Sequence, residues 1–496
     1  MAKPQQYLNF IAGRWVSAKS GKNFPNINPA NREEILGFFP DSGPEDVNAA
    51  VQAAESAFPE WRLVPPPGRG EIILKAGLLM KERKEELARL MTQEMGKVLR
   101  ETRGDVQEAI DMAYFIAGEG RRLFGKTTTS ELRDKFAMTI RMPVGVCGLI
   151  TPWNFPMAIP SWKIFPSLIC GNTMVFKPAE DTPLSALKMI EILEEAGLPK
   201  GVVNLVQGGV KTGEAMVRHP KIRLISFTGS CEVGRLVAEH CGKNLKRCSL
   251  EMGGKNAQIV MEDADLDLAI EGAVWGAYGT TGQRCTATSR IFVQEKIFSS
   301  FKKSFLERSR KIKIGDGLKE GVEMGPLINE AQLKRVRDYV EIGKKEGAKL
   351  EMGGEPARGK GLEKGFFFEP TLFTEVDPKM RIAQEEIFGP VTCLIPFKRF
   401  EDAIRMVNDS SYGLSSSIYS RDVNRAMEAI RDIEAGITYI NGPTIGAEVH
   451  LPFGGVKNTG NGHREGGETA IDIFSEWKSV FVDYSGKLQK AQIDVD

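Results

Sequence analysis

Short apolar runs alternate with helix-length segments from residue 144 onward, and this alternation constrains the fold more than any other feature of the chain. The runs are predicted strands at 144–150, 172–177, 202–206 and 223–227. Between the second and third runs, Thr182 and Pro183 are typical of a helix start and Gly197 of a helix end. Strands joined by helices of this length pair in parallel through right-handed crossovers. The chain is therefore predicted to be an α/β protein with a doubly wound parallel sheet, whose ligands bind outside the carboxyl ends of its strands.

Two further regions extend this organisation. The chain before residue 130 is predicted to be mainly helical after a short strand region, and a second alternating series follows the first. Segment 231–241 is predicted to be a helix that turns Val233, Leu236 and Val237 toward the core. No internal repeat or low-complexity linker marks a sharp domain boundary.

The composition excludes several classes of protein. With 496 residues the chain is long enough for about three structural units, and 42% hydrophobic residues can bury a large core. Lys and Arg total 66 against 65 Asp and Glu, so the net charge of +1 gives no field that would draw the molecule to nucleic acid or to an anionic membrane. Seven cysteines, no signal-peptide pattern and no apolar run of membrane-spanning length predict a soluble, cytoplasmic protein.

Cys285 is the strongest candidate for a reactive group. It lies in the polar loop Gly-Thr-Thr-Gly-Gln-Arg-Cys-Thr between a predicted helix and a predicted strand, whereas a structural cysteine normally lies among apolar residues. The adjoining Arg284 is a candidate for stabilising the thiolate. The other cysteines are assigned to packing. The group His240, Cys241 and Cys248 has no fourth ligand nearby, so no metal site is predicted.

Two polar residues are candidates to assist a nucleophile. Glu251 opens Glu-Met-Gly-Gly-Lys-Asn directly after a predicted strand, and a partly desolvated carboxylate there has the raised pKa that a general base needs. Asn154, in Thr-Pro-Trp-Asn-Phe-Pro, follows the strand at 144–150, and its side-chain amide can donate to a developing oxyanion. Taken singly, an ordinary surface glutamate and an Asx-turn explain these two residues as well.

Two further motifs are typical of nucleotide binding. Lys177 and Glu180 stand at the end of a predicted strand, where a cation and a carboxylate suit the hydroxyls of a ribose, although a surface salt bridge is the plain alternative. In Phe-Thr-Gly-Ser-Cys-Glu-Val-Gly, Gly229 permits a turn from strand to helix, and Ser230 with the free N–H groups of the helix start can meet a phosphate. The spacing from Gly229 to Gly234 departs from G-x-G-x-x-G, so the dinucleotide fingerprint is imperfect.

Taken together, these motifs resemble the ordered signatures of the NAD(P)-dependent aldehyde dehydrogenase superfamily. The matching segments span essentially the whole chain: Pro-Trp-Asn-Phe-Pro at 152–156, Lys-Pro-Ala-Glu at 177–180, Phe-Thr-Gly-Ser at 227–230, Glu-Met-Gly-Gly-Lys at 251–255, Gly-Gln-Arg-Cys at 282–285, Glu-Glu-Ile-Phe-Gly-Pro at 385–390 and Pro-Phe-Gly-Gly-Val-Lys at 452–457. Met252 stands where the family commonly has leucine, which is a conservative apolar change. Seven motifs in one order are far more specific than any single one.

The resemblance implies an activity and a set of residue roles. Cys285 would be the nucleophile, Glu251 the base that activates the deacylating water, and Asn154, with the backbone N–H of Cys285, the oxyanion site. An aldehyde would be oxidised to a carboxylic acid through a thiohemiacetal and a thioester, with NAD as cofactor and NADP left open as a second one. The residues implied to bind the cofactor are Trp153, Lys177, Glu180, Gly229, Ser230, Gly234, Glu386 and Phe388.

The resemblance also implies three structural parts. Residues 1–126 and 144–260 would form a cofactor-binding domain and 261–455 a catalytic domain. Residues 127–143 would join the extended tail 474–496 in a small oligomerisation element of β structure. The protein would then be a homo-oligomer, a dimer or a tetramer, that acts on a small-molecule aldehyde.

Two residues bear on the identity of that aldehyde. Trp162, eight residues after Asn154, stands where the succinic semialdehyde branch of the family carries an arginine, which disfavours that substrate and favours an apolar tail. The loop around Arg284 resembles those of bacterial sugar-acid pathway enzymes that oxidise 2-oxoglutaric semialdehyde. Arg284 either binds a substrate carboxylate at the entrance or points away into a helix–loop contact. We expect medium-chain or aromatic aldehydes to be accepted, with a carboxylated semialdehyde as the physiological candidate.

Other functions stay open on the sequence alone. A cysteine hydrolase or acyltransferase would use Cys285 without a redox step, and a catalytically silent structural protein could keep the same fold. The nucleotide motifs favour redox chemistry, and the joint presence of Cys285, Glu251 and Asn154 weighs against a silent protein. A CoA-acylating variant is disfavoured because Glu251, the implied water activator, is present.

Overall fold

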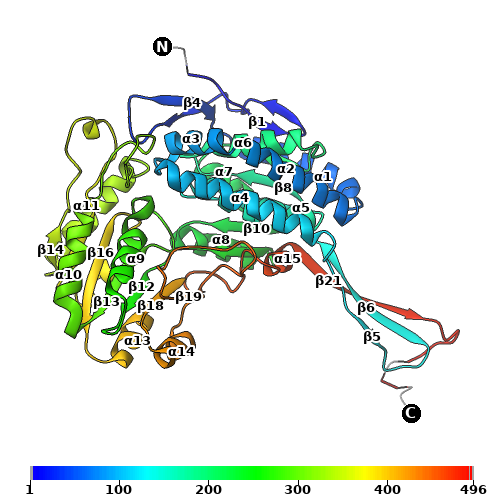
Figure 1. The fold of residues 1–496 in the computed structure, drawn as a ribbon. Helices are drawn as coiled ribbons and strands as arrows, with labels where there is room; N and C mark the ends of the chain where they lie inside the picture. The colour runs from blue at the N-terminus through cyan, green and yellow to red at the C-terminus, as the bar shows by residue number, and fades with distance from the viewer. Residues whose placement is uncertain (1–3, 491, 494–496) are drawn as a thin grey trace.

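The computed structural model describes residues 4–490 and 492–493, and its body is built around two large sheets (Figure 1). In spatial order, the first sheet consists of β11 (Arg247–Glu251), β10 (Leu224–Thr228), β7 (Val146–Ile150), β8 (Thr173–Lys177), β9 (Val203–Leu205), β1 (Asn9–Ile11) and β2 (Arg14–Val16). Strands β11 to β9 are parallel, and the hairpin of β1 and β2 extends the edge in antiparallel fashion. The predicted doubly wound parallel sheet is therefore confirmed.

The four predicted strands correspond to β7, β8, β9 and β10, within one or two residues at each end. The crossover helices are α5 (Ala158–Ile169), α6 (Pro183–Glu195), α7 (Val210–Arg218) and α8 (Cys231–Lys243). The chain adds β8 and β9 on one side of β7 and then returns to add β10 and β11 on the other. This reversal creates a switch point beside β7, where ligands of such sheets bind.

The start of α6 differs in one detail from the sequence-based prediction. Thr182 occupies the N-cap position with Pro183 next, but the Thr182 side chain makes no capping hydrogen bond. The backbone N–H groups of Leu184 and Ser185 instead donate to the buried carboxylate of Glu94, at 2.6 and 2.8 Å. A carboxylate from a distant helix therefore satisfies the donors that a local cap would otherwise take.

The second sheet contains, in spatial order, β14 (Lys349–Met352), β15 (Thr371–Thr374), β16 (Val391–Phe397), β13 (Thr288–Gln294), β12 (Asn256–Val260), β18 (Ser415–Tyr419) and β19 (Ile437–Ile440). Its longer helices are α9 (Leu266–Tyr278), α10 (Glu295–Ser309), α11 (Glu330–Lys345), α13 (Phe400–Asn408) and α14 (Val423–Asp432). Because β12 belongs to this sheet, the chain changes sheets between Glu251 and Asn256, before the boundary predicted at 260. Glycines allow the close crossing there, since a Cβ on Gly254 would lie 2.5 Å from the carbonyl oxygen of Cys285.

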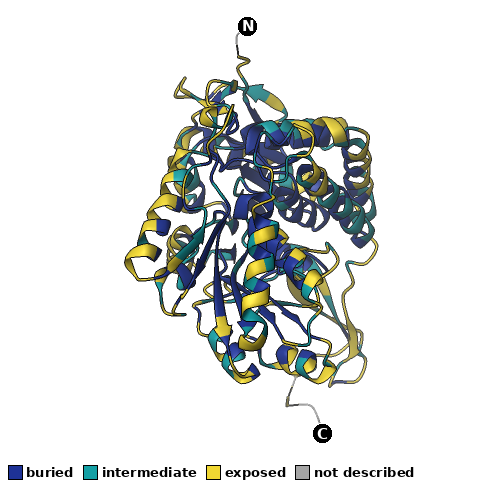
Figure 2. Cartoon of the chain, turned by 60° about the vertical axis from the view of Figure 1, so that its left-hand side comes forward, coloured by how far each residue is buried: buried dark blue, intermediate teal, exposed yellow. Residues whose placement is uncertain are grey.

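Helices from the N-terminal part lie on both faces of the first sheet, since the first of them packs on β8 and β9 beside α7, whereas the other three pack on the crossover helices α5 and α6 of the opposite face. They are α1 (Pro44–Trp61), α2 (Pro66–Glu82), α3 (Lys84–Met95) and α4 (Leu99–Glu119). Helix α1 begins at Pro44 as predicted, and its residues Val47, Ala50 and Val51 are fully buried. Figure 2 shows that the strands are buried while the outer faces of many helices are exposed. Among the described residues, none of the helices combines the length and the apolar character needed to span a bilayer.

The remaining elements are short. They are β3 (Asn23–Ile27), β4 (Ile35–Pro40), the 3-10 turns η1 (Gly279–Gly282) and η2 (Leu362–Lys364), α12 (Arg381–Gln384), β17 (Tyr412–Gly413), β20 (Val456–Lys457) and α15 (Thr469–Phe474). The turn η1 follows α9 directly and leads into the Cys285 loop.

A three-stranded arm projects from the body (Figure 1). It pairs β5 (Thr127–Thr129) with β6 (Lys135–Pro143), and β6 with β21 (Ser475–Asp483). These strands fall in the segments 127–143 and 474–496 that the sequence assigned to one element, although residues 491 and 494–496 lie outside the described part, as do residues 1–3 of the first predicted domain. The functional roles given to the three parts stay predictions.

Candidate active site

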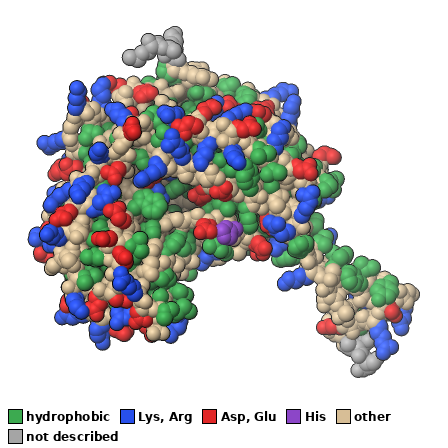
Figure 3. All heavy atoms as spheres, in the orientation of Figure 1, with side chains coloured by type: hydrophobic (Ala, Val, Ile, Leu, Met, Phe, Trp, Pro, Cys, Tyr) green, Lys and Arg blue, Asp and Glu red, His purple; other side chains and the backbone are tan. Residues whose placement is uncertain are grey.

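The catalytic candidates come together between the two large sheets. Asn154 lies in the loop after β7, and its side-chain amide donates to the carbonyl oxygen of Gln283 at 3.2 Å. Asn256, at the start of β12, donates to the carbonyl oxygen of Cys285 at 2.7 Å. The Cys285 loop is thus tied to the first sheet through Asn154 and to the second through Asn256. Figure 3 shows a hollow between the two halves of the body on the face seen in Figure 1.

The surroundings of Cys285 differ from the electrostatic support predicted for it. Burial, together with the nearby carboxyl groups of Glu386 and Glu251, raises the pKa of the Cys285 thiol to about 12. Backbone N–H groups of the loop act in the opposite direction. Arg284, expected as a partner for the thiolate, turns its guanidinium to Glu101 at 3.1 Å. The side chain thus takes the helix–loop contact, one of the two placements weighed from the sequence.

Glu251 ends β11 with its carboxylate buried, at 3% exposure. Among the described residues, neither carboxylate oxygen has a hydrogen-bond partner. Burial raises its pKa well above that of a free glutamate, and the charge of Glu465 raises it further. Space beside the carboxylate depends on Gly454, because a Cβ there would lie 2.5 Å from Glu251 Oε1. A carboxyl group with these properties is suited to accept a proton near neutral pH.

A buried ion pair beside Glu251 was missed by the sequence analysis. Lys163, on α5, forms an ion pair with Glu465 and also donates to the Ser226 hydroxyl at 3.0 Å. Both Lys163 and Arg464 lower the pKa of Glu251 and so oppose the effect of burial. The pair escaped notice because Lys163 and Glu465 are 302 residues apart and neither lies in a motif that signals catalysis.

A cavity of about 520 Å³ opens beside the carboxyl end of β8 and contains both predicted ribose ligands. The Lys177 ammonium donates to the carbonyl oxygens of Pro178 and Gly208, at 2.8 and 2.7 Å, and lies 3.7 Å from the Glu180 carboxylate. The Lys177 side chain is buried, whereas that of Glu180 is half exposed. A fixed cation and a free carboxylate at a cavity wall fit the hydroxyls of a bound ribose.

The prediction for α8 was partly wrong. Val237 is buried at 3% exposure, but Val233 and Leu236 are exposed at 45% and 62%. These two side chains line the same cavity as Lys177 and Glu180. Apolar spacing on a helix does not distinguish a face that packs on the core from a face that packs on a ligand, which is why the sequence pattern misplaced them.

The turn from β10 into α8 has the close packing that its glycines imply. A Cβ on Gly229 would lie 2.5 Å from the Phe227 ring, and a Cβ on Gly234 would lie 2.3 Å from the sulfur of Met252. Ser230 is the N-cap of α8, and its hydroxyl accepts from the N–H of Val233 at 3.3 Å. Ser230 fixes the first turn of α8, whose start is exposed, and the pyrophosphate role given to this turn stays a prediction.

On the other side of the hollow, Trp153 and Phe388 meet edge to face, with ring centroids 5.4 Å apart. Phe388 has a φ of +63°, an uncommon conformation for an aromatic residue that often marks a functional position. Glu386 accepts from the N–H of Gly254 at 3.0 Å, and burial raises its pKa to about 7. The structure thus gathers the remaining predicted cofactor residues beside the Cys285 loop.

Trp162 lies deeper than a residue at a site entrance. It is 4% exposed and packs edge to face on Phe453, with ring centroids 5.3 Å apart. Its indole N–H has no hydrogen-bond partner among the described residues. Trp162 therefore forms part of an apolar wall under the site.

Comparison with known proteins agrees with this arrangement. The model of the aldehyde dehydrogenase family matches residues 15–480. The chain is 44% identical to the alpha-ketoglutaric semialdehyde dehydrogenase of Bacillus subtilis, over 96% of this chain and 98% of that protein. It is 43% identical to the 2,5-dioxopentanoate dehydrogenase of Saccharolobus solfataricus, over 95% of this chain and 98% of that protein. The crystal structure of betaine aldehyde dehydrogenase from Staphylococcus aureus, in complex with NAD+, superposes with a TM-score of 0.95 at 35% identity and covers 97% of this chain and 95% of that one. The chain belongs to the aldehyde dehydrogenase family and is an NAD(P)-dependent aldehyde dehydrogenase.

Proposed function

We propose that the protein oxidises its aldehyde to a carboxylic acid by covalent catalysis at Cys285. The observation that carries the proposal is the convergence of Cys285, Asn154 and a buried Glu251 carboxylate, which has no hydrogen-bond partner in the described part of the chain, between the two sheets. Each group comes from a different segment of the chain. A merely structural cysteine would not require the other two to lie beside it.

The chemistry divides among these residues. The Cys285 thiol gives its proton to water and its sulfur adds to the carbonyl carbon. The resulting alkoxide is stabilised by the Asn154 side-chain amide and a backbone N–H of the loop. NAD(P)+ held by the predicted cofactor residues, among them Lys177, Glu180 and Glu386, would supply the acceptor for the hydride that leaves the substrate carbon. The alkoxide then becomes a carbonyl and the acyl group stays on Cys285 as a thioester.

Glu251 completes the cycle in this proposal. It takes a proton from a water molecule whose oxygen bonds to the acyl carbon, the carbon–sulfur bond breaks, and the carboxylic acid leaves. The raised pKa of Glu251 favours this exchange near neutral pH. The CoA-acylating alternative is disfavoured by the same carboxylate.

The geometry around Glu180 favours NAD over NADP. A carboxylate 3.7 Å from the Lys177 ammonium and half exposed to the cavity would accept from ribose hydroxyls and would repel a 2′-phosphate. The neighbouring Lys177 offsets part of this repulsion, so NADP remains a second cofactor in the proposal. Comparing kcat/KM for the two cofactors tests it, and a clear advantage for NADP would exclude the role given to Glu180.

For the substrate we propose a carboxylated semialdehyde of the 2-oxoglutaric type. The two relatives named above carry names for this five-carbon oxo-acid aldehyde and match nearly the full chain. The aromatic Trp162 also favours medium-chain or aromatic aldehydes as further substrates, since an apolar side chain at this place suits an apolar tail. A panel of aldehydes screened with both cofactors would rank these classes.

One assay separates this function from a cysteine hydrolase. NADH absorbance and cleavage of an activated ester are followed on the same preparation, before and after alkylation of Cys285. We expect NADH formation to depend on both aldehyde and Cys285. Ester cleavage without any aldehyde-dependent NADH formation would establish the hydrolase instead.

We also propose that the arm mediates homo-oligomerisation. Trp477, Phe481 and Val482 of β21 are 50%, 63% and 46% exposed, and Phe136 of β6 is 41% exposed. Figure 3 shows hydrophobic side chains along the projecting arm. Apolar surface of this extent on a thin ribbon is typical of a contact with another subunit. Light scattering of a Trp477→Glu and Phe481→Glu double variant should report a smaller species than the natural chain.

A further inference from the structure

Three charged residues next to and within α4 form a stripe that faces the catalytic loops. Lys97, Glu101 and Asp105 are spaced four residues apart, which places successive members on one face of a helix. Their side chains are almost entirely buried, at 0%, 7% and 0% exposure. None of the proposed chemical steps uses them.

Glu101 holds the turn that leads into Cys285. Its Oε1 accepts from the backbone N–H of Thr280 at 2.8 Å and from the Arg284 guanidinium at 3.1 Å. Thr280 and Thr281 have φ values of +53° and +57°. A β-branched residue rarely adopts this conformation, so two in succession need external support. The single carboxylate oxygen of Glu101 supplies it at the first of the two.

Lys97 and Asp105 hold the other side of the site, the loop that carries Asn154. Their ion pair measures 2.8 Å, and the second oxygen of Asp105 accepts from the N–H of Ala158, the first residue of α5, at 2.8 Å. The Lys97 ammonium lies 3.4 Å from the centroid of the Phe155 ring. Because Phe155 follows Asn154 directly, this contact limits where the Asn154 amide can lie.

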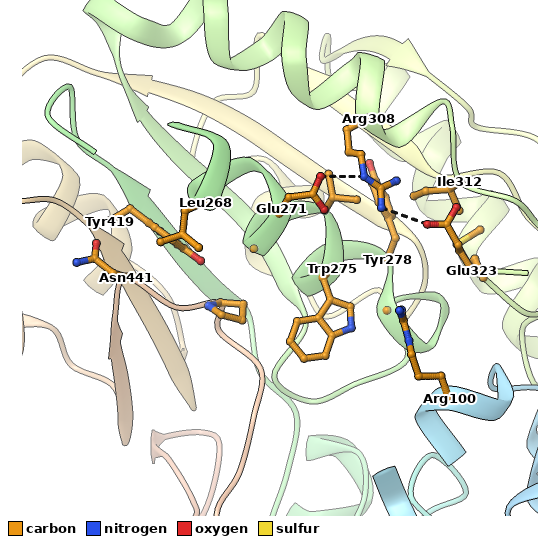
Figure 4. Close-up of a pocket in the computed structure, with 15 residues that line it drawn as sticks. Arg100, Leu268, Glu271, Trp275, Tyr278, Arg308, Ile312, Glu323, Tyr419 and Asn441 are labelled. Atoms are coloured by element: carbon orange, nitrogen blue, oxygen red, sulfur yellow. Dashed lines mark hydrogen bonds and ion pairs between the residues drawn. The ribbon is translucent and has the colours of Figure 1, made fainter. Parts of the chain in front are cut away.

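Arg284 joins the two sides of the site. Its Cζ lies 5.5 Å from the centroid of Phe155 and 5.9 Å from that of Trp275. Trp275, on α9, lines a separate cavity of about 550 Å³ (Figure 4). The Arg284 Nε also donates to the Thr280 hydroxyl at 2.8 Å. A guanidinium held by carboxylate, hydroxyl and ring contacts has little freedom to move.

We propose that Glu101 is a positioning residue, which through Thr280 and Arg284 sets the distance between the Cys285 sulfur and the Asn154 amide. The inference rests on the proposed covalent mechanism. Its physical basis is that Cys285 and Asn154 lie in loops beside different sheets. The hydrogen bond from the Asn154 amide to the Gln283 carbonyl joins these loops directly, and a third element that contacts both loops adds a second constraint on their spacing. The stripe at α4 binds both, and a small misplacement of such groups costs rate more than binding.

The alternative is that the stripe serves stability alone. A buried ion pair often contributes little or nothing to stability over apolar packing, so its retention is no proof of function. The two roles differ in what a substitution changes. A positioning role affects the step that needs the oxyanion site, whereas a purely structural role affects every property of the site together.

The test uses Glu101→Gln and Glu101→Leu in the full-length protein. Glutamine keeps an oxygen acceptor for Thr280, whereas leucine removes it. We expect single-turnover NADH formation to fall by about tenfold in the glutamine variant and by about 100-fold in the leucine variant. Alkylation of Cys285 by iodoacetamide, a displacement that needs no oxyanion site, should stay within about threefold in both, and so should the Kd for NAD.

The matched control is Glu85→Gln. Glu85, on α3, also accepts from arginines, at 2.8 to 2.9 Å, but its side chain is 51% exposed. This variant should keep the single-turnover rate of the natural chain. NADH formation within threefold in the leucine variant would overturn the proposal, and so would a parallel loss of NADH formation, alkylation and NAD binding in the glutamine variant.

The protein without substitutions, measured in the same assay, distinguishes failure of the covalent mechanism from failure of the positioning role of Glu101. If alkylation of Cys285 leaves its NADH formation intact, the covalent mechanism is wrong and the positioning role falls with it. If alkylation abolishes NADH formation while the Glu101 variants behave like the natural chain, only the positioning role is wrong.

Discussion

The cavity beside β8 and the loop around Cys285 are built in opposite ways. Lys177 and Glu180 come from one strand end. The Lys177 ammonium donates to backbone carbonyls of the same α/β unit and lies 3.7 Å from the Glu180 carboxylate. The Cys285 loop is held by side chains from α4, the β7 loop and β12. The first region is an open cavity wall, whereas the second is a closed network of buried charges and strained turns.

This difference indicates a division of labour. A cavity formed by one folding unit can bind its ligand whatever happens at the catalytic loop, so binding and chemistry should be separable by mutation. The loop depends on several segments at once, so substitutions there should act on rate, and neighbouring substitutions should not be additive.

The largest expected effect tests that separation directly. Cys285→Ser should lower aldehyde oxidation by about 1000-fold or more, because a serine oxygen is a far weaker nucleophile than a cysteine sulfur and gives up its proton less readily. The Kd for NAD should stay unchanged, as measured by quenching of tryptophan fluorescence. Retention of near-normal turnover would end the covalent mechanism.

Glu251→Gln should slow the steady state by about 100-fold or more while sparing hydride transfer. Stopped-flow absorbance should show one equivalent of NADH per site in a fast phase, followed by slow turnover. If the fast phase slows as much as the steady state, Glu251 acts before the thioester forms.

The pH dependence sharpens the same prediction. The active form of Glu251 is the carboxylate, and burial together with Glu465 raises its pKa. The steady-state rate should therefore rise with pH as the proton is lost, over a range above that of a free glutamate, and this limb should vanish in Glu251→Gln. A limb at the pH of an ordinary exposed carboxyl group would contradict the structure.

Arg284→Met distinguishes the two placements weighed for this side chain. A substrate-binding role predicts a KM raised by about tenfold for carboxylated aldehydes alone. The contact with Glu101 instead predicts that kcat falls by about tenfold for carboxylated and aliphatic aldehydes alike. Steady-state kinetics on one aldehyde of each class decides between them.

The smallest effect on kinetics is expected for a substitution of Glu180, in the wall of the cavity beside β8. Glu180→Gln should raise kcat/KM with NADP, relative to NAD, by about two- to fivefold, because half-exposed charges interact weakly. Val210, which is 81% exposed at the same cavity, offers a control in Val210→Ala. An unchanged ratio in Glu180→Gln would show that cofactor choice lies elsewhere.

Much of the fold could be predicted because its signals are local. The alternation of apolar runs with capped helices identified β7, β8, β9 and β10 and their parallel pairing. The switch from the first sheet to the second was misplaced, because β12 is as apolar as the strands before it and nothing in its composition says which sheet it joins.

The residues of the site also divide into those with a local sequence signal and those without one. Motifs identified Cys285, Glu251 and Asn154 because each lies in a short polar segment, Glu251 and Asn154 at or just after a strand end and Cys285 in a loop between a helix and a strand. The Lys163 pair with Glu465 could not be found, since its members are 302 residues apart and each resembles an ordinary charged residue. The exposed face of Val233 and Leu236 was misread because an apolar ligand surface and an apolar core surface have the same spacing.

The sequence by itself determined the α/β class, the strand ends that carry polar motifs and the residues available for chemistry, because all of these depend on neighbours a few positions away. Only the tertiary structure decided where Arg284 points, which carboxylate supports Thr280 and why Glu251 lacks a partner. Those contacts join segments more than 100 residues apart. Burial and charge pairing at such places depend on which side chains the folded chain brings together, and no local pattern encodes that choice.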